Sequence, residues 1–252
     1  MSPTRAAGIE RWDVAQAAEG KYWDAARQDE VELLRIMQEK AAAMRWCMKE
    51  VPACFESVGR WVEIGIGPIG VGCVHLIAAP SRELVGVDPL RPVELRAEKL
   101  SPAFRSLVAG CQSAAYRHLV GRGEHVDLPD ESAALIVCYN VLDHCEDPAR
   151  VVRESTRVLG RGNHLILGCD VYSTAGRIKH RVRAGLARAS GVTLDSIADL
   201  AHPHQFVASD LEALVDGEGL EIVAMNNRPA EALQRLWSHA HRMLIVARKR
   251  DR

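Results

Sequence analysis

Six short β-rich runs, separated mostly by helical stretches, constrain the fold of this chain more than any other feature. The runs are WVEIGI (61–66), ELVGVD (83–88), AALIVCYN (133–140), NHLILGCD (163–170), LEIVAMNN (220–227) and HRMLIVAR (241–248). One intervening stretch, PARVVRESTRVLG, is amphipathic and begins just after Asp147 and Pro148, as a helix should. Alternating strands and helices favour a parallel sheet covered on both faces, so we expect an α/β fold.

Two connections depart from this alternation. About forty residues separate Asp170 from the helical stretch near 209–217, which is too many for an ordinary connection. We expect an insertion at about 171–206 that forms a lid or a substrate pocket. The last two runs lie only about a dozen residues apart with Pro229 between them, which favours a hairpin and an antiparallel last strand.

The residues before the first run are predicted to be helical. Apolar side chains recur there at helical spacing, as at Val31, Leu34 and Met37, with charged side chains between them. A chain of 252 residues suits one domain with additions. We therefore expect a helical cap over residues 1–57 and an α/β domain with the lid over residues 58–252.

Composition and charge narrow the class of partner. The 32 basic and 33 acidic residues leave a net charge of -1, so nothing global attracts nucleic acid or a membrane surface. The sequence has no signal-peptide core and no run of about 18 apolar residues, and its seven cysteines lack the two-residue spacing of zinc or redox motifs. We expect a cytoplasmic protein with free buried cysteines, a small-molecule partner and no membrane insertion, and we leave a homodimer open.

The first run leads into a glycine-rich turn. Gly65, Gly67 and Gly70 form a G-x-G-x-x-G pattern directly after the run, and Asp88 ends the next run. Glycines let the backbone approach a nucleotide closely, and a carboxylate after the second strand accepts hydrogen bonds from ribose hydroxyls. The pattern alone fits NAD as well as other adenosine cofactors.

Two neighbours of these glycines favour a cofactor without a pyrophosphate. Glu63 stands two residues before the first glycine, where a carboxylate would repel phosphate and attract a cation. Pro68 occupies the tip of the turn and has no N–H to offer to a phosphate. A cofactor with an amino group and a sulfonium, and with no phosphate, fits these charges better.

Longer stretches carry a family resemblance. They are VEIGIGPIGVG, ELVGVD, GEHVDLPDESAALIVCYNVLDHCEDPARVVRESTRVLGRGNHLILG and HPHQF. In this order and spacing, over about residues 58–250, they resemble the class I S-adenosylmethionine-dependent methyltransferases, in particular the bacterial small-molecule branch. The resemblance implies a Rossmann-like, seven-stranded, mostly parallel sheet of order 3-2-1-4-5-7-6 with an antiparallel last strand. It also implies methyl transfer to oxygen or nitrogen of a small molecule, in secondary metabolism or quinone-like biosynthesis.

The resemblance further implies which residues hold S-adenosylmethionine. Glu63 would meet the methionine amino group, Asp88 the ribose hydroxyls and Glu124 the adenine amino group. The glycines would form the cofactor turn, and the two residues after the fourth strand would line the methionine end. The full set is Glu63, Gly65, Gly67, Gly70, Asp88, Glu124, His125, Tyr139 and Asn140.

Histidines are the candidates for a catalytic base, because their pKa lies near neutrality. His144 follows the fourth strand and His204 lies where the lid returns to the sheet, so we expect these two to be catalytic. His202 is expected to contact substrate or to position the lid. A metal site would need a third ligand, and the sequence offers no obvious one. The remaining expected substrate contacts are Tyr22, Trp23 and Tyr172.

Two departures from the family pattern keep other functions open. Ile69 stands where the family often has a third small residue, and Ala134 stands where it often has an aspartate. Ala134, together with the absence of a certain catalytic base, leaves a non-catalytic member that binds the cofactor as a scaffold or regulator as one alternative. An NAD(P)-dependent oxidoreductase is the other, because the glycine spacing and Asp88 fit it as well.

Overall fold

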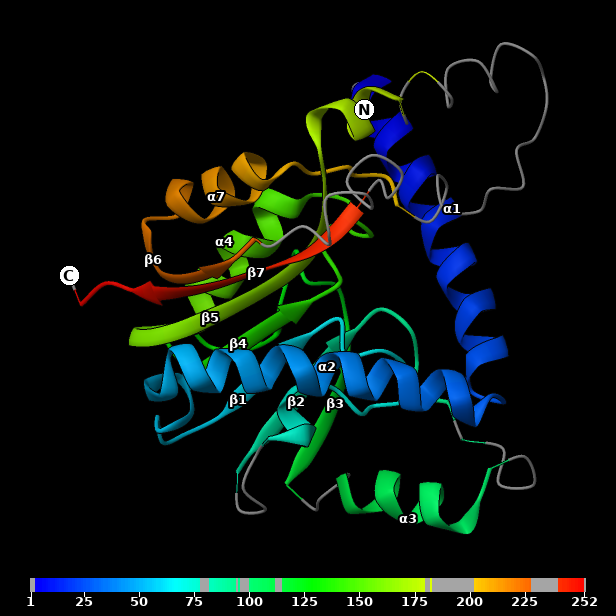
Figure 1. Ribbon diagram of the computed structural model, residues 1–252. Coiled ribbons are helices and arrows are strands. Elements are labelled where there is room, and N and C mark those ends of the chain that lie inside the picture. The colour runs from blue at the N-terminus through cyan, green and yellow to red at the C-terminus, as the bar shows by residue number, and fades with distance from the viewer. Residues whose placement is uncertain are drawn as a thin grey trace.

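The computed structural model places seven strands in one mixed sheet of order β3-β2-β1-β4-β5-β7-β6 (Figure 1). All neighbouring strands pair in parallel except β5 with β7 and β7 with β6, which are antiparallel. The strands are β1 (Trp61–Ile64), β2 (Leu84–Asp88), β3 (Tyr116–Val120), β4 (Ala133–Tyr139), β5 (Leu159–Tyr172), β6 (Leu220–Asn226) and β7 (Ala240–Lys249). The expected order, the terminal hairpin and the antiparallel last strand are confirmed.

Helices cover both faces of this sheet. They are α1 (Pro3–Ala26), α2 (Glu30–Glu50), α3 (Pro102–Cys111), α4 (Pro148–Val158) and α7 (Ala208–Gly217), with short 3₁₀ helices η1 (Pro52–Phe55) and η2 (Val74–Leu76). The structure describes residues 3–77, 82–93, 95, 100–111, 115–179, 182, 202–227 and 240–251. Of the predicted lid at 171–206, residues 180–181 and 183–201 lie outside these ranges.

The central strand shows why the sheet is buried on both sides. Every residue of β4 is buried, as expected for a parallel strand between two helical layers. Ile136 and Cys138 belong to the core beneath α4 and α7, whereas Leu135 and Val137 belong to the core beneath α2, which includes Met44. Successive side chains of β4 therefore point to opposite faces of the sheet and pack into two separate cores.

Helix starts follow from capping side chains. Asp147 accepts a hydrogen bond from the backbone N of Arg150, and Pro148 is the first residue of α4, as the sequence predicts. Asp29 likewise accepts bonds from the backbone N–H groups of Val31 and Glu32 at the start of α2. The end of α4 differs from the prediction, because the chain enters β5 directly at Leu159 instead of completing the helical stretch.

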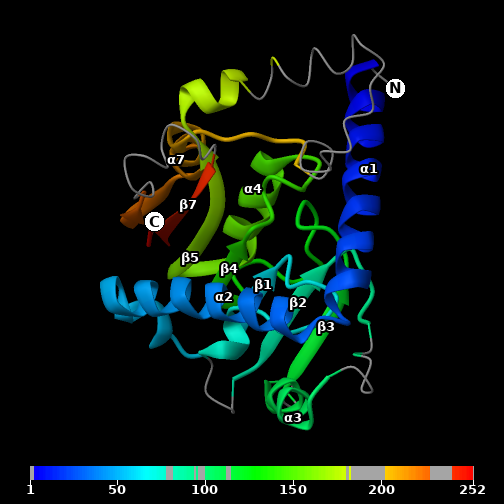
Figure 2. The same cartoon turned by 45° about the vertical axis from the view of Figure 1, so that its right-hand side comes forward.

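The two N-terminal helices take different positions relative to the sheet. Helix α2 crosses one face, and α1 stands along the side of the molecule, beside the ends of β1, β2 and β4 (Figures 1 and 2). The turn between them is short, because Asp29 N bonds to Ala26 O at 2.9 Å. The helices therefore form a cap that bends around one edge of the α/β domain.

The described part of the chain agrees with two further expectations. Its six described cysteines with assigned side-chain burial are free and buried: Cys47, Cys54, Cys73, Cys138, Cys145 and Cys169. Among the helices in the described ranges, none has both the length and the hydropathy that crossing a membrane requires.

Truncating the core should destabilise the fold. Ile166 on β5 is fully buried in the core beneath α2, so Ile166→Ala should lower the free energy of unfolding by about 2 to 5 kcal/mol. Urea unfolding followed by circular dichroism measures this change. Val58→Ala is the control, because Val58 is 90% exposed and its truncation should change stability by at most about 0.5 kcal/mol. Equal losses in both variants would contradict the assignment of the core.

Candidate active site

A cavity of about 590 Å³ lies between the N-terminal helices and the carboxyl ends of the strands. Its wall includes Ile64, Asp88 and Tyr139 at the ends of β1, β2 and β4. Ligands of open α/β sheets bind at this edge, and the volume is within the range of small-molecule sites. From α1 and α2 the wall receives Trp12, Gln16, Ala18, Glu19, Tyr22, Trp23, Arg35, Ile36, Glu39 and Lys40.

The glycine-rich turn forms one side of the cavity. Gly65 and Gly67 have φ angles of +73° and +84°, which residues other than glycine rarely adopt. A Cβ on Gly65 would lie 2.0 Å from Val141 Cγ2, and one on Gly67 would lie 3.0 Å from the Trp23 ring. Both line the cavity, whereas Gly70, with φ +69°, closes the turn outside its wall through a bond from its N–H to Gly67 O.

Asp88 is the buried carboxylate of the cavity. Its Oδ2 accepts a hydrogen bond from Gly67 N at 2.8 Å, and its Oδ1 accepts one from Leu90 N at 2.9 Å. Burial raises the pKa of Asp88 to about 6, although these two N–H donors oppose the shift. The carboxylate thus joins the glycine turn to the end of β2, and each oxygen retains capacity for a further hydrogen bond.

Glu63 lies behind the cavity wall, paired with a lysine that the sequence analysis missed. The carboxylate is fully buried; its Oε2 accepts from Val74 N at 3.0 Å, and its Oε1 lies 3.4 Å from Lys40 Nζ. Lys40 Nζ also donates to Ile66 O at 3.3 Å, and Lys40 lines the cavity whereas Glu63 does not. A Cβ on Gly72 would lie 2.1 Å from Glu63 Oε2, so this glycine makes room for the carboxylate.

The loop after β3 forms the next part of the wall. Glu124 Oε1 accepts hydrogen bonds from Glu146 N at 2.7 Å and Asp147 N at 3.2 Å, which ties this loop to the start of α4. Glu124 lines the cavity as expected. His125 does not, because its side chain is exposed and its backbone N–H bonds to Arg122 O.

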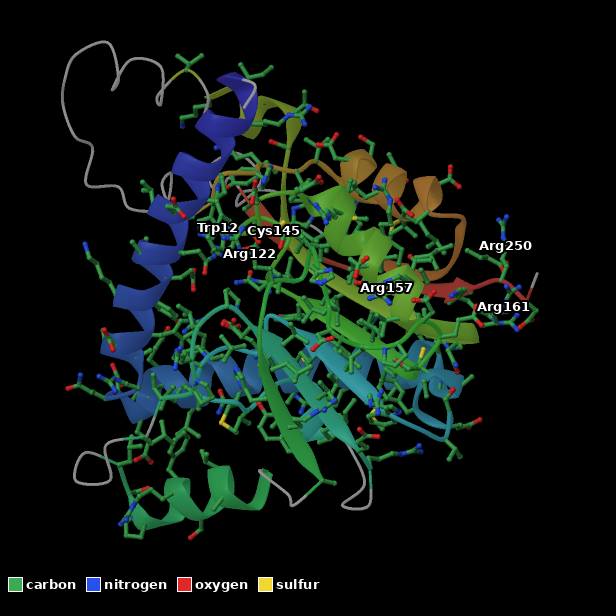
Figure 3. All side chains as sticks on the ribbon, turned by 180° about the vertical axis from the view of Figure 1, so that it is seen from behind. Trp12, Arg122, Cys145, Arg157, Arg161 and Arg250 are labelled. Carbon is green, nitrogen blue, oxygen red and sulfur yellow. The ribbon has the colours of Figure 1, made fainter. Side chains whose placement is uncertain are left out.

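Helix α1 contacts this loop through a pair of side chains. The Arg122 guanidinium lies 3.6 Å from the centre of the Trp12 ring, a cation–π contact. Figure 3 shows these two side chains together with Cys145, between α1 and the loops at the strand ends. All three line the cavity, so the helix and the loops share one wall.

The residues after β4 occupy the opposite end of the cavity. Asn140 has a φ of +60°, and its N–H donates to Gly168 O at 2.7 Å. The Tyr139 ring lies 4.7 Å from the guanidinium of Arg242, which donates to Asp170 Oδ1 at 2.6 Å. Tyr139 and Asn140 line the cavity, together with Asp170 and Arg242, which the sequence analysis did not single out.

Two imidazoles meet a buried aspartate at this end. His202 Nδ1 lies 2.7 Å from Asp143 Oδ2, and His144 Nε2 lies 3.6 Å from the same oxygen. Although burial opposes both shifts, the neighbouring imidazoles lower the pKa of Asp143 to about 2, and Asp143 raises the pKa of His202. His144 and His202 line the cavity. Asp143, beside both imidazoles, is the third possible metal ligand that the sequence did not reveal.

Two further predicted site residues lie outside the cavity wall, in addition to Glu63, Gly70 and His125. His204 is outside the cavity wall, because its Nε2 is 2.9 Å from Cys145 O and its backbone N–H donates to Asp143 O. It holds the loop instead of facing a substrate. Tyr172 is also outside the wall, at the end of β5, where its backbone N–H donates to Phe206 O.

The two aromatic residues expected at the site from α1 do reach it. Trp23 packs against the Gly67 turn, and Tyr22 lines the cavity while its hydroxyl donates to Glu32 Oε1 at 2.7 Å. Both are therefore placed to contact a bound molecule. Glu19, on the same helix, was not predicted, and its Oε1 lies 3.2 Å from His144 Nδ1.

Residues 62–167, from β1 into β5, match the family described as "Methyltransferase domain". This segment is a domain of the class I S-adenosylmethionine-dependent methyltransferases. The matched family uses S-adenosylmethionine, which favours this cofactor over the nicotinamide alternative. A curated relative from Methanocaldococcus jannaschii, an uncharacterized protein, is 27% identical over 110 residues, which cover 44% of each chain.

Solved structures share the fold of this methyltransferase at low sequence identity. The YcgJ protein of Bacillus subtilis is 18% identical with a TM-score of 0.58, over 84% of this chain and 99% of that one. Geranyl diphosphate C-methyltransferase of Streptomyces coelicolor is 12% identical with a TM-score of 0.56, over 87% and 81%. A phosphoethanolamine N-methyltransferase of Haemonchus contortus is 12% identical with a TM-score of 0.57, over 85% and 53%.

Cofactor affinity should depend on pH through Asp88. Because its pKa is about 6, the Asp88 carboxyl is largely protonated below that pH in the protein without cofactor. A protonated carboxyl accepts hydrogen bonds from ribose hydroxyls less well. Affinity for S-adenosylhomocysteine should therefore rise by up to about 10-fold between about pH 5 and pH 7. Calorimetric titration measures this. Asp88→Asn should bind weakly with no such rise; an unchanged pH profile in that variant would assign the titration to another group.

Filling the space at Gly72 should disturb the buried ion pair. Gly72→Ala should lower stability by about 1 to 3 kcal/mol and weaken S-adenosylhomocysteine binding, because the new methyl group displaces the Glu63 carboxylate. Urea unfolding and calorimetry measure the two effects. Gly217→Ala is the matched control, since a Cβ there meets no atom within 4 Å. Indistinguishable behaviour of the two variants would show that the Glu63 position tolerates displacement.

Proposed function

We propose that this methyltransferase transfers the methyl group of S-adenosylmethionine to an oxygen or nitrogen atom of a small-molecule acceptor, in secondary metabolism or quinone-like biosynthesis. The observation that carries the proposal is the pair of imidazoles, His144 and His202, in the cavity wall beyond Asn140. An acceptor hydroxyl or amine must lose a proton during methylation, and imidazole is suited to receive one near neutral pH.

The proposed position of the cofactor follows from the chemistry of the wall. Asp88 binds the ribose hydroxyls, and the adenine lies between the end of β2 and the loop that holds Glu124. The methionine part follows the Gly65–Gly67 turn towards Lys40, whose ammonium suits the methionine carboxylate. The sulfonium methyl then points to the end of the cavity beyond Asn140, where the acceptor binds.

Alignment supplies most of the rate in this mechanism. Methyl transfer is an in-line displacement, so the protein must hold the acceptor atom, methyl carbon and sulfur in one line and exclude water. The walls that α1 and α2 contribute to the cavity serve this purpose. Asp170 and Arg242, paired at 2.6 Å in the same wall, offer polar contacts that orient the acceptor.

A non-catalytic role was suggested by Ala134, and its position weakens that alternative. Ala134 lies near the amino end of β4, where its backbone N–H donates to Arg60 O. The cavity is at the carboxyl end of the same strand. The missing aspartate is therefore remote from the place where we expect the methyl group. The homodimer and the cytoplasmic location stay predictions.

Binding and product analysis test the proposed function. Wild-type protein should release or absorb heat on titration with S-adenosylmethionine, and Asp88→Ala should reduce affinity at least about 10-fold by removing the ribose contacts. Incubation with cofactor and a panel of phenols, alcohols and amines should give singly methylated products by mass spectrometry. Absence of binding heat with wild type would refute the proposal, and methylation found only on carbon would refute its choice of acceptor atom.

A further inference from the structure

We propose that Asp143, His144 and His202 bind a divalent transition-metal ion at the acceptor end of the cavity. The ion's use in methyl transfer rests on the proposed function, but its binding does not. The ligand atoms of these three side chains lie within 4.8 Å of one another. Within the described part of the chain, no other three His, Cys, Asp or Glu side chains come as close.

Ligand spacing fits a metal centre after a small adjustment. Metal bonds to imidazole nitrogen and carboxylate oxygen are about 2.0 to 2.2 Å long, so neighbouring ligand atoms lie roughly 3.0 to 3.5 Å apart. The distance from Asp143 Oδ2 is 3.6 Å to His144 Nε2 and 2.7 Å to His202 Nδ1. Moving the His202 ring outward by roughly 0.3 Å or more brings its separation into this range, and the separation of 3.6 Å to His144 already lies next to it.

The surroundings hold the ligands as a metal site requires. A ligating histidine usually presents its other ring nitrogen to a carboxylate. His144 Nδ1 is buried, forms no aligned hydrogen bond, and has Glu19 Oε1 3.2 Å away. With Nε2 bound to an ion, Nδ1 carries the ring proton. After a slight rotation, Glu19 can accept a hydrogen bond from this N–H group.

A second set of contacts brings the ligands together from distant parts of the chain. Asp143 and His144 follow β4, and His202 comes from the segment directly before α7. His204 joins the two segments, because its backbone N–H donates to Asp143 O and its Nε2 lies 2.9 Å from Cys145 O. The His204 contacts therefore set the position of His202 against Asp143.

Charge and exposure also suit a catalytic type of site. Asp143 is 3% exposed, and its charge together with that of Glu19 balances a divalent ion. His144 and His202 face the cavity, so an ion between them has a coordination position open to a ligand there. Three protein ligands and one open position are typical of catalytic zinc sites, and two imidazoles with a carboxylate also suit Fe²⁺, Mn²⁺ or Co²⁺.

The ion would act on the acceptor as a Lewis acid. An acceptor hydroxyl that occupies the open position becomes more acidic. It gives its proton to solvent water, because with an ion present the two imidazoles are ligands and no longer act as the base. Its oxygen lone pair then forms the new bond to the methyl carbon, and the electron pair of the breaking sulfur–carbon bond stays on sulfur. The products are the methyl ether and S-adenosylhomocysteine, with no change in the oxidation state of the ion.

Metal titration of the full chain tests the site without any acceptor. Chelator-treated protein should bind one Co²⁺ per chain, seen by visible absorption, and Zn²⁺ should displace it. Asp143→Asn and His202→Gln should each weaken Co²⁺ binding by at least about 10-fold, and Glu19→Gln should weaken it less. The matched controls, Asp127→Asn on the surface and His118→Gln on β3, should bind as wild type does.

Circular dichroism and S-adenosylhomocysteine calorimetry on the same samples separate the outcomes. Folded variants that still bind S-adenosylhomocysteine but lose Co²⁺ support the site. Wild type that binds S-adenosylhomocysteine but no Co²⁺ or Zn²⁺, or variants that bind Co²⁺ unchanged, overturn it and leave a hydrogen-bonded imidazole–carboxylate cluster. Wild type that binds Co²⁺ but no cofactor refutes the proposed function and keeps the metal site.

Discussion

The buried ion pair between Glu63 and Lys40 is the interaction on which the rest of the site depends. A fully buried carboxylate is tolerated only with compensating partners, and here the two partners come from two other parts of the chain. Lys40 belongs to α2, Glu63 to β1, and the Val74 N–H to η2. The pair thereby joins α2 to the first strand, and it leaves the lysine beside the glycine turn where we propose that the cofactor binds.

Much of the architecture follows from patterns within short segments. Short apolar runs predict every strand except β3, whose residues are only half-buried or exposed, and Asp147 with Pro148 predicts the start of α4, because both signals are local. The short connection between the last two runs likewise predicts their hairpin. The glycine turn could be predicted equally well, because Gly65 and Gly67 adopt left-handed backbone angles that glycine favours.

The contacts between distant segments could not be predicted from local sequence patterns. Lys40 has the helical spacing of an ordinary surface lysine, so nothing in its neighbours indicates a buried partner on β1. His202 and His204 are two residues apart, and only the folded path of the loop turns one towards Asp143 and the other towards Cys145. Asp143 was overlooked because its neighbour His144 carried the catalytic expectation.

The segment shared with the family contains only part of the cavity end at which we propose that the acceptor binds. It spans residues 62–167, whereas Asp170, His202 and Arg242 follow it and the walls from α1 and α2 precede it. Evolution can therefore exchange these parts while the sheet and the cofactor turn stay constant. Two proteins that match the family equally well over this segment need have no acceptor in common, and the information on chemistry lies in the sequence that the match leaves out.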